Sequence, residues 1–134
     1  MEAAAKILVV GGVLNLAYSF VTGFLLANTR RTKPYASRYL VFAHVGPLMQ
    51  GPMLLGLVFA VTLSPQPALV KTLAASLMVA ESGFLAAKDT LNWGQRVKDE
   101  FVERPPGGIV LGGISVLLGV VGLLIFMVGI VQGL

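Results

Sequence analysis

Four long apolar runs account for most of the 134 residues of this chain. They extend over about Ala5–Ala27, Tyr39–Leu63, Ala68–Ala87 and Gly108–Leu134. A helix needs about 20 apolar residues to cross the ~30 Å hydrocarbon layer of a bilayer, and each run is long enough. The sequence therefore predicts an all-α integral membrane protein, with residues 1–134 forming one domain of four transmembrane helices in the lipid bilayer.

The composition excludes several other classes of protein. Apolar residues make up 56% of the chain and charged residues 12%, so nothing is left from which to build a soluble catalytic or nucleic-acid-binding domain. Without cysteine, the chain can form no disulfide, thiolate metal site, iron–sulfur cluster or thioether-linked haem. The first run is too long, and too poor in a small-residue cleavage pattern, to be a removable signal peptide. We expect it to stay as a helix.

The positive charges are concentrated in two of the three connections between runs. These cations are Arg30, Arg31, Lys33 and Arg38 in the first connection and Lys88, Arg96, Lys98 and Arg104 in the third. The N-terminus and the second connection hold one lysine each. The net charge of +4 could indicate polyanion binding, but orientation in the bilayer is the simpler interpretation. We predict that both charged connections are cytoplasmic and both termini outside.

The connection between the last two runs, Lys88 to Pro106, has an amphipathic pattern. Trp93, Val97 and Phe101 recur every four residues among charged side chains. This spacing predicts a short amphipathic helix lying at the membrane interface, anchored by Trp93. A helix that binds a partner protein is the alternative.

Small residues recur in three runs at the spacing that lets helices approach closely in lipid. The stripes are Gly11, Asn15, Ser19 and Gly23; Ser76, Ala80, Gly83 and Ala87; and Gly112, Ser115, Gly119 and Gly122. Packing within the chain is the simpler interpretation of any single stripe. Because four helices offer little interior, we also expect contacts between copies of the chain and a ligand site at such an interface.

His44 and Glu81 are the only ionisable residues deep in the runs, where such groups are costly. Counted from the charged connections, both lie roughly 9–11 Å along their helices, at a similar depth. One interpretation is a His44–Glu81 hydrogen bond that tethers two helices. The other is that His44 is an axial ligand of haem iron.

The segment around the histidine, from Ala43 to Met53, is rich in proline and glycine. Pro47 frees the carbonyl of Ala43 from the helix ladder, and the glycines leave room for a flat ligand against the backbone. On an ideal helix His44 and Gly51 share a face, so a planar ligand bound at His44 could lie over Gly51. Gln50 points elsewhere unless the prolines distort the turn.

The pattern Ala43-His44-x-Gly46-Pro47-x-x-Gln50-Gly51-x-Met53 resembles that of styrene oxide isomerase, a small bacterial membrane protein with four spans that binds haem b. In the same register Glu81 stands where that family has an aspartate. The resemblance implies a homotrimer in the bacterial inner membrane, with His44 as the axial metal ligand of a haem held between protomers. Gly51 and Glu81 would lie near that cofactor.

The resemblance also implies a reaction, in which ferric iron acts as a Lewis acid and isomerises a small apolar epoxide to an aldehyde. Gln50 and Asp89 stand at the positions of the asparagine and tyrosine that line the family's substrate site. Gln50 keeps the amide, whereas an ionised Asp89 cannot donate a hydrogen bond to an epoxide oxygen. Haem binding is therefore the firmer expectation, and whether the chain is an enzyme stays open.

Two other functions are compatible with the sequence. A non-catalytic membrane subunit or scaffold would use the small-residue stripes to dock onto larger partners. A transporter could relay protons through Glu81, although no inverted repeat is detectable. No nucleophile–base pair or phosphate-binding loop is present, which argues against conventional hydrolysis.

Overall fold

The computed structural model describes residues 1–134 and is all helical. Its elements are α1 (Ala3–Thr32), α2 (Arg38–Leu63), α3 (Ala68–Gly94), α4 (Glu100–Glu103) and α5 (Pro106–Gly133). The four long helices are each long and apolar enough to cross a membrane. The predicted fold class, an all-α membrane protein with four spans, is therefore confirmed.

Local sequence explains where these helices begin and end. Ser37 caps the start of α2, because its Oγ accepts a hydrogen bond from the backbone N–H of Tyr39. α5 begins at Pro106, where the missing N–H of proline costs nothing. α2 ends at Leu63, one residue before the Ser64-Pro65 pair, since a residue before proline disfavours helical backbone.

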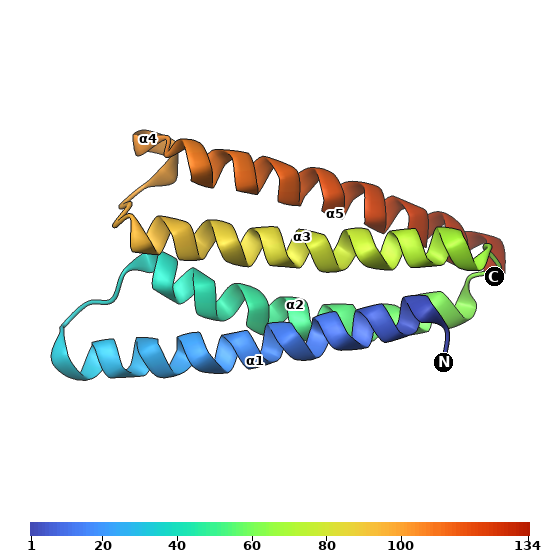
Figure 1. Ribbon diagram of the computed structural model, residues 1–134, viewed down its shortest axis with the longest axis horizontal. Coiled ribbons are helices and arrows are strands. Elements are labelled where there is room, and N and C mark those ends of the chain that lie inside the picture. The colour runs from blue at the N-terminus through green and yellow to red at the C-terminus, as the bar shows by residue number, and fades with distance from the viewer.

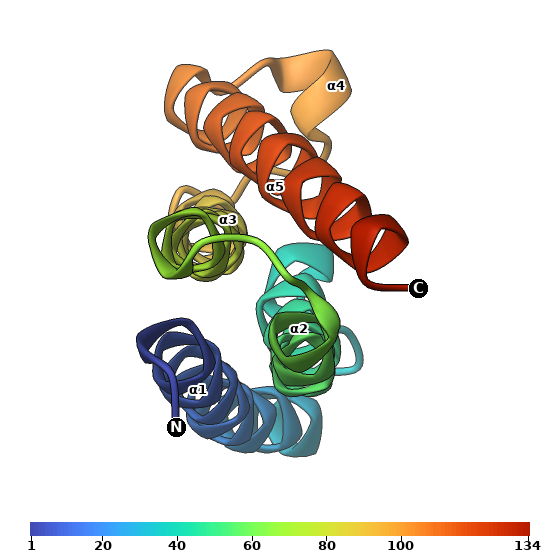
Figure 2. The same ribbon diagram turned by 90° about the vertical axis from the view of Figure 1, so that its right-hand side faces the viewer.

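The four long helices form an up-and-down bundle (Figure 1). The α1–α2 and α3–α5 connections lie at one end, and both termini lie at the other. α1 packs mainly on α2 and α5 mainly on α3, with α3 also contacting α1 and α2. Seen along the bundle, α1 and α5 lie on opposite sides (Figure 2). Both basic connections are thus on one side of the molecule, as the charge distribution predicts.

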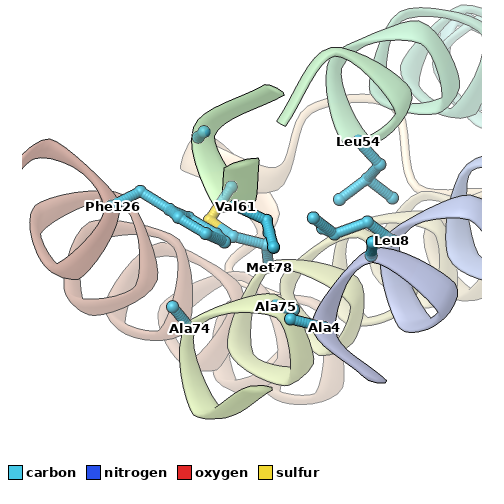
Figure 3. Packing of buried hydrophobic residues seen from close by; sticks show 10 residues of the cluster. Ala4, Leu8, Leu54, Val61, Ala74, Ala75, Met78 and Phe126 are labelled. Carbon is cyan, nitrogen blue, oxygen red and sulfur yellow. The ribbon is translucent and has the colours of Figure 1, made fainter. Parts of the chain in front are cut away.

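The apolar core fills the half of the bundle nearer the termini. Its members include Leu8 of α1, Leu54 of α2, Met78 of α3 and Phe126 of α5, all of them buried (Figure 3). Many large apolar side chains on the outer faces stay exposed, which suits a surface in contact with lipid. Most polar side chains buried within the spans lie in the other half or near the middle.

The segment expected to form an amphipathic helix, Lys88 to Pro106, is built differently. Its first seven residues continue α3 to Gly94, so Trp93 belongs to that helix, and α4 is a single turn. Arg96 ends α3 in the left-handed conformation, with φ of 58°, and the N–H of Val97 bonds the Asn92 carbonyl. The connection is therefore a turn, a loop and one helical turn; its position at a membrane interface remains a prediction.

The small-residue stripes of α1 and α5 pack within the chain, as the simpler interpretation predicted. Asn15 donates a hydrogen bond to Ser82 of α3 over 2.9 Å, and a Cβ at Gly119 would lie 2.9 Å from Glu81 Cγ. The stripe of α3 is different, because Ser76, Gly83 and Ala87 are exposed. Contact between copies of the chain remains a prediction, and this outer face of α3 is open to it.

Candidate functional site

The α1–α2 contact fixes how α2 is rotated about its axis. A Cβ added at either Gly12 or Gly51 would lie 3.0 Å from the other residue's carbonyl oxygen, so the two backbones touch here. Leu16 packs directly over Gly51, which is buried. The expectation that a flat ligand lies over Gly51 is therefore not supported, because α1 takes that space.

His44 lies on the same side of α2 and packs against α1. Its Nδ1 is 2.9 Å from the carbonyl oxygen of Ser19 and 3.1 Å from Ser19 Oγ. Ser19 Oγ in turn donates to the His44 carbonyl over 3.0 Å. A Cβ at Gly23 would lie 2.7 Å from His44 Cε1, so the ring fits only because residue 23 is glycine. The imidazole is half-buried and held by two residues of the α1 stripe.

These contacts select one tautomer of His44. An Nδ1–H that donates to the Ser19 carbonyl leaves the lone pair on Nε2, which has no hydrogen-bond partner and is not enclosed. Histidines that bind metals usually donate their other ring N–H in this way. The chain has no group of three side chains able to hold a metal ion, so His44 could serve only as a single protein ligand. Such a site could hold haem iron, because the porphyrin already supplies four nitrogen ligands and the protein needs to add only one.

The distorted backbone near His44 is satisfied from α1. The Ala43 carbonyl, which Pro47 frees from the helix ladder, accepts a hydrogen bond from Thr22 Oγ1 over 3.1 Å. Thr22 lies between Ser19 and Gly23 on α1 and is buried. As expected, the Ala43 carbonyl is available to a partner outside its own helix, and the Thr22 hydroxyl of α1 is that partner.

Glu81 lies away from His44, at the contact of α3 with α2 and α5. Its Oε1 accepts a hydrogen bond from Gln50 Nε2 over 3.2 Å and a longer one from Ser115 Oγ over 3.4 Å. The proposed His44–Glu81 tether is therefore absent, since His44 turns toward α1 while Gln50, six residues later, turns toward α3. Glu81 Oε2 and Gln50 Oε1 are buried without a partner. This cluster has more acceptors than donors.

Asp89 belongs to a second buried polar cluster, nearer the basic end of the bundle. Lys88 Nζ lies 3.4 Å from Asp89 Oδ1 and 3.1 Å from Glu100 Oε1. Asn92 Nδ2 donates to the other oxygen of Glu100 over 2.9 Å. A Cβ at Gly46 would lie 3.9 Å from Asp89 Oδ2, so this carboxylate faces α2 one turn below Gln50. One lysine is therefore shared by two carboxylates, and Asp89 Oδ1 has no hydrogen-bond partner.

The residues predicted for the site thus divide into two groups. His44 and Gly51 face α1, whereas Gln50, Glu81 and Asp89 face the contacts of α3. Ser19 and Gly23 were predicted as packing residues of a small-residue stripe, with no place beside the histidine. Ser115 was likewise predicted for packing and not as a hydrogen-bond donor to Glu81. Spacing shows which residues share a face, but not which helix that face meets.

Comparison with known proteins adds no family to this description. No protein-family model, no curated protein and no solved structure matches the chain. The function proposed below therefore depends on the geometry of the His44 site together with the short pattern from Ala43 to Met53.

Proposed function

We propose that the protein is an integral membrane haem b protein in which Nε2 of His44 is the axial ligand. The observation that carries this proposal is the hydrogen bond from Nδ1 to the Ser19 carbonyl, which orients the ring and leaves Nε2 free. Gly23 gives the ring its space, and Ser19 keeps it from rotating. Bound there, ferric haem would supply a Lewis acid.

The surroundings of His44 favour a cofactor shared between copies of the chain. The ring is half-buried, and the three main clefts of the molecule do not include it. A haem held at His44 would need further apolar surface, which a second copy would provide. We propose a homo-oligomer, a trimer by resemblance, in a bacterial inner membrane with the basic connections cytoplasmic.

Isomerisation of a small apolar epoxide is the reaction that the resemblance implies. Gln50 donates its amide to Glu81, and Asp89 is paired with Lys88, so neither side chain is free to orient an epoxide beside His44 of the same chain. Gln50 and Asp89 therefore remain catalytic candidates by resemblance alone. Haem binding does not depend on their role.

A non-catalytic membrane subunit is the second candidate function. The observation that favours it is the exposed small-residue stripe on α3, where a Cβ at Gly83 would meet nothing within 4 Å. Such a face permits close contact with another helix. In that case His44 would only join α2 to α1.

Absorption spectroscopy distinguishes these two functions. The full-length protein is purified in detergent, incubated with haemin and then separated from unbound haemin. It should retain a Soret band that is lost in His44→Ala, while helical circular dichroism stays unchanged. Met49→Leu is the matched control, because Met49 is an exposed thioether on the same helix and the other type of side chain there that could ligate iron. Equal haem content in wild type and His44→Ala would contradict the proposal.

A further inference from the structure

A cleft of about 730 Å³ opens at the end of the bundle where both basic connections lie. It is bordered by the end of α1, the start of α2 and the turn that follows α3, and its lining includes Ser37 and Trp93. Its volume lies within the range of roughly 300–1,000 Å³ that is usual for ligand sites. Neither the proposed haem ligand nor its partners on α1 line it.

The charge of this cleft is strongly one-sided. Four of its lining residues are cations, namely Lys33, Arg38, Arg96 and Lys98, and none is a carboxylate. Asp99, just outside the cleft, pairs with Arg38, with 3.6 Å between Oδ2 and Nη1. Glu103 Oε1 accepts a hydrogen bond from the backbone N–H of Lys98. Three cations from two connections therefore converge without a carboxylate partner. Their charges repel one another, and a bound anion would relieve that repulsion.

Arg96 is placed there by an unfavourable backbone conformation. Its φ of 58° lies in the left-handed region, where a helix usually ends on glycine. Its N–H bonds the Trp93 carbonyl over 3.0 Å as part of the turn that ends α3. Glycine would make the same turn with less strain, so the turn itself does not require an arginine at position 96. Strain of this kind is common at functional sites.

We propose that this cleft binds the phosphate group of an anionic ligand, and that the ligand is the headgroup of an anionic phospholipid. Arginine and lysine make charge-assisted hydrogen bonds to phosphate, and the start of α2 at Arg38 adds the positive end of a helix. Trp93, which lines the same cleft, is a residue type typical of the headgroup level of a membrane. These features favour a lipid over a soluble phosphate.

Trp93 also supplies the measurement, because it is the only tryptophan of the chain. Full-length protein in neutral detergent is titrated with phosphatidylglycerol, with phosphatidylcholine of the same acyl chains, and with inorganic phosphate, while tryptophan emission is recorded. We expect saturable binding of phosphatidylglycerol alone. Saturation by phosphate as well would support a phosphate site open to soluble ligands and overturn the restriction to lipid. An equal response to both lipids would overturn the proposal.

Arg96→Gly tests the cleft itself, because it removes one cation and relieves the backbone. We expect binding about fivefold to tenfold weaker, with an unchanged or higher unfolding temperature. Arg104→Gly is the matched control: Arg104 has φ of 49°, and the cleft does not include it. Equal weakening by both variants, or none by Arg96→Gly, would overturn the proposal. Repeating the titration with His44→Ala removes quenching by any bound haem and keeps the two proposals separate.

Discussion

The buried cluster around Glu81 gives the sharpest test of the packing between α2, α3 and α5. Glu81 Oε1 accepts hydrogen bonds from Gln50 and Ser115, while Glu81 Oε2 and Gln50 Oε1 are buried with no donor. Glu81→Gln supplies two N–H donors in nearly the same shape. Glu81→Met removes every polar atom of the side chain and avoids a branched Cγ beside Gly119. We expect Glu81→Gln to be tolerated and Glu81→Met to destabilise the bundle.

The size of the effect follows from the groups left without partners. Methionine removes the acceptor of two hydrogen bonds, each worth about 0.6 kcal/mol on average in a membrane protein, and leaves the Gln50 amide buried and unpaired at a cost of about 1–3 kcal/mol. Together these contributions predict a loss of about 2–4 kcal/mol. Glutamine should change stability by less than about 1 kcal/mol, and in the stabilising direction if its amide reaches Gln50 Oε1.

Reversible unfolding in mixed SDS and neutral-detergent micelles, followed by circular dichroism, measures these free energies. The double variant Gln50→Leu/Glu81→Met removes both partners, so it should be less destabilised than the sum of its two single variants. The reasoning is refuted if Glu81→Met is as stable as wild type. It is also refuted if Glu81→Gln loses as much as Glu81→Met, because the negative charge itself would then be what the cluster needs.

Two further predictions concern contacts away from that cluster. Gly51→Ala places a Cβ 3.0 Å from the Gly12 carbonyl, so we expect a loss of about 1–3 kcal/mol in the same assay, whereas Gly56→Ala, which meets nothing within 4 Å, should be neutral. Lys71→Met removes an ion pair of 2.8 Å with Glu2, and should expose the start of α1 to faster amide hydrogen exchange at a cost of about 1–2 kcal/mol.

The four spans could be predicted because hydrophobic length is a local property of the sequence. The end of the third span was less predictable. Asp89 and Asn92 look like residues of a loop, yet α3 continues to Gly94 with both of them buried. Lys88 pairs with the carboxylate of Asp89, and Glu100, from the next element, accepts from Asn92. The partner of Asp89 is thus its neighbour in the sequence, whereas the partner of Asn92 is supplied by tertiary structure, which no local pattern shows.

The candidate residues of the site were predictable, but their arrangement was not. Counting along the helices predicted similar depths for His44 and Glu81, yet Glu81 pairs with Gln50, which lies six residues, or about 9 Å, along α2 from His44. The rotation of α2, however, is set by the contact between Gly12 and Gly51, which joins residues far apart in the sequence. That contact turns His44 toward Ser19 and Gln50 toward Glu81. His44 and Glu81 thus lie in separate environments.

Gly23 gives the last test of whether the orientation of His44 matters. At Gly23→Ala the new Cβ would lie 2.7 Å from Cε1 and 2.9 Å from Nδ1 of His44, so the ring must leave the Ser19 carbonyl or α1 must move away. Because a ring that leaves Ser19 no longer holds Nε2 in place, we expect haem retention to fall sharply.

The matched control for Gly23→Ala is Gly11→Ala, in the same stripe of α1. Its Cβ would lie 2.5 Å from Val79 Cγ2, so it introduces a clash of similar severity far from the histidine. The chain has a single histidine, whose imidazole proton resonances report the hydrogen bond to Ser19 without any cofactor. Gly23→Ala should shift those resonances and release haem, and Gly11→Ala should do neither, although both lower the unfolding temperature. If both variants release haem equally, retention depends on bundle stability as a whole, and the orienting role of Gly23 is wrong.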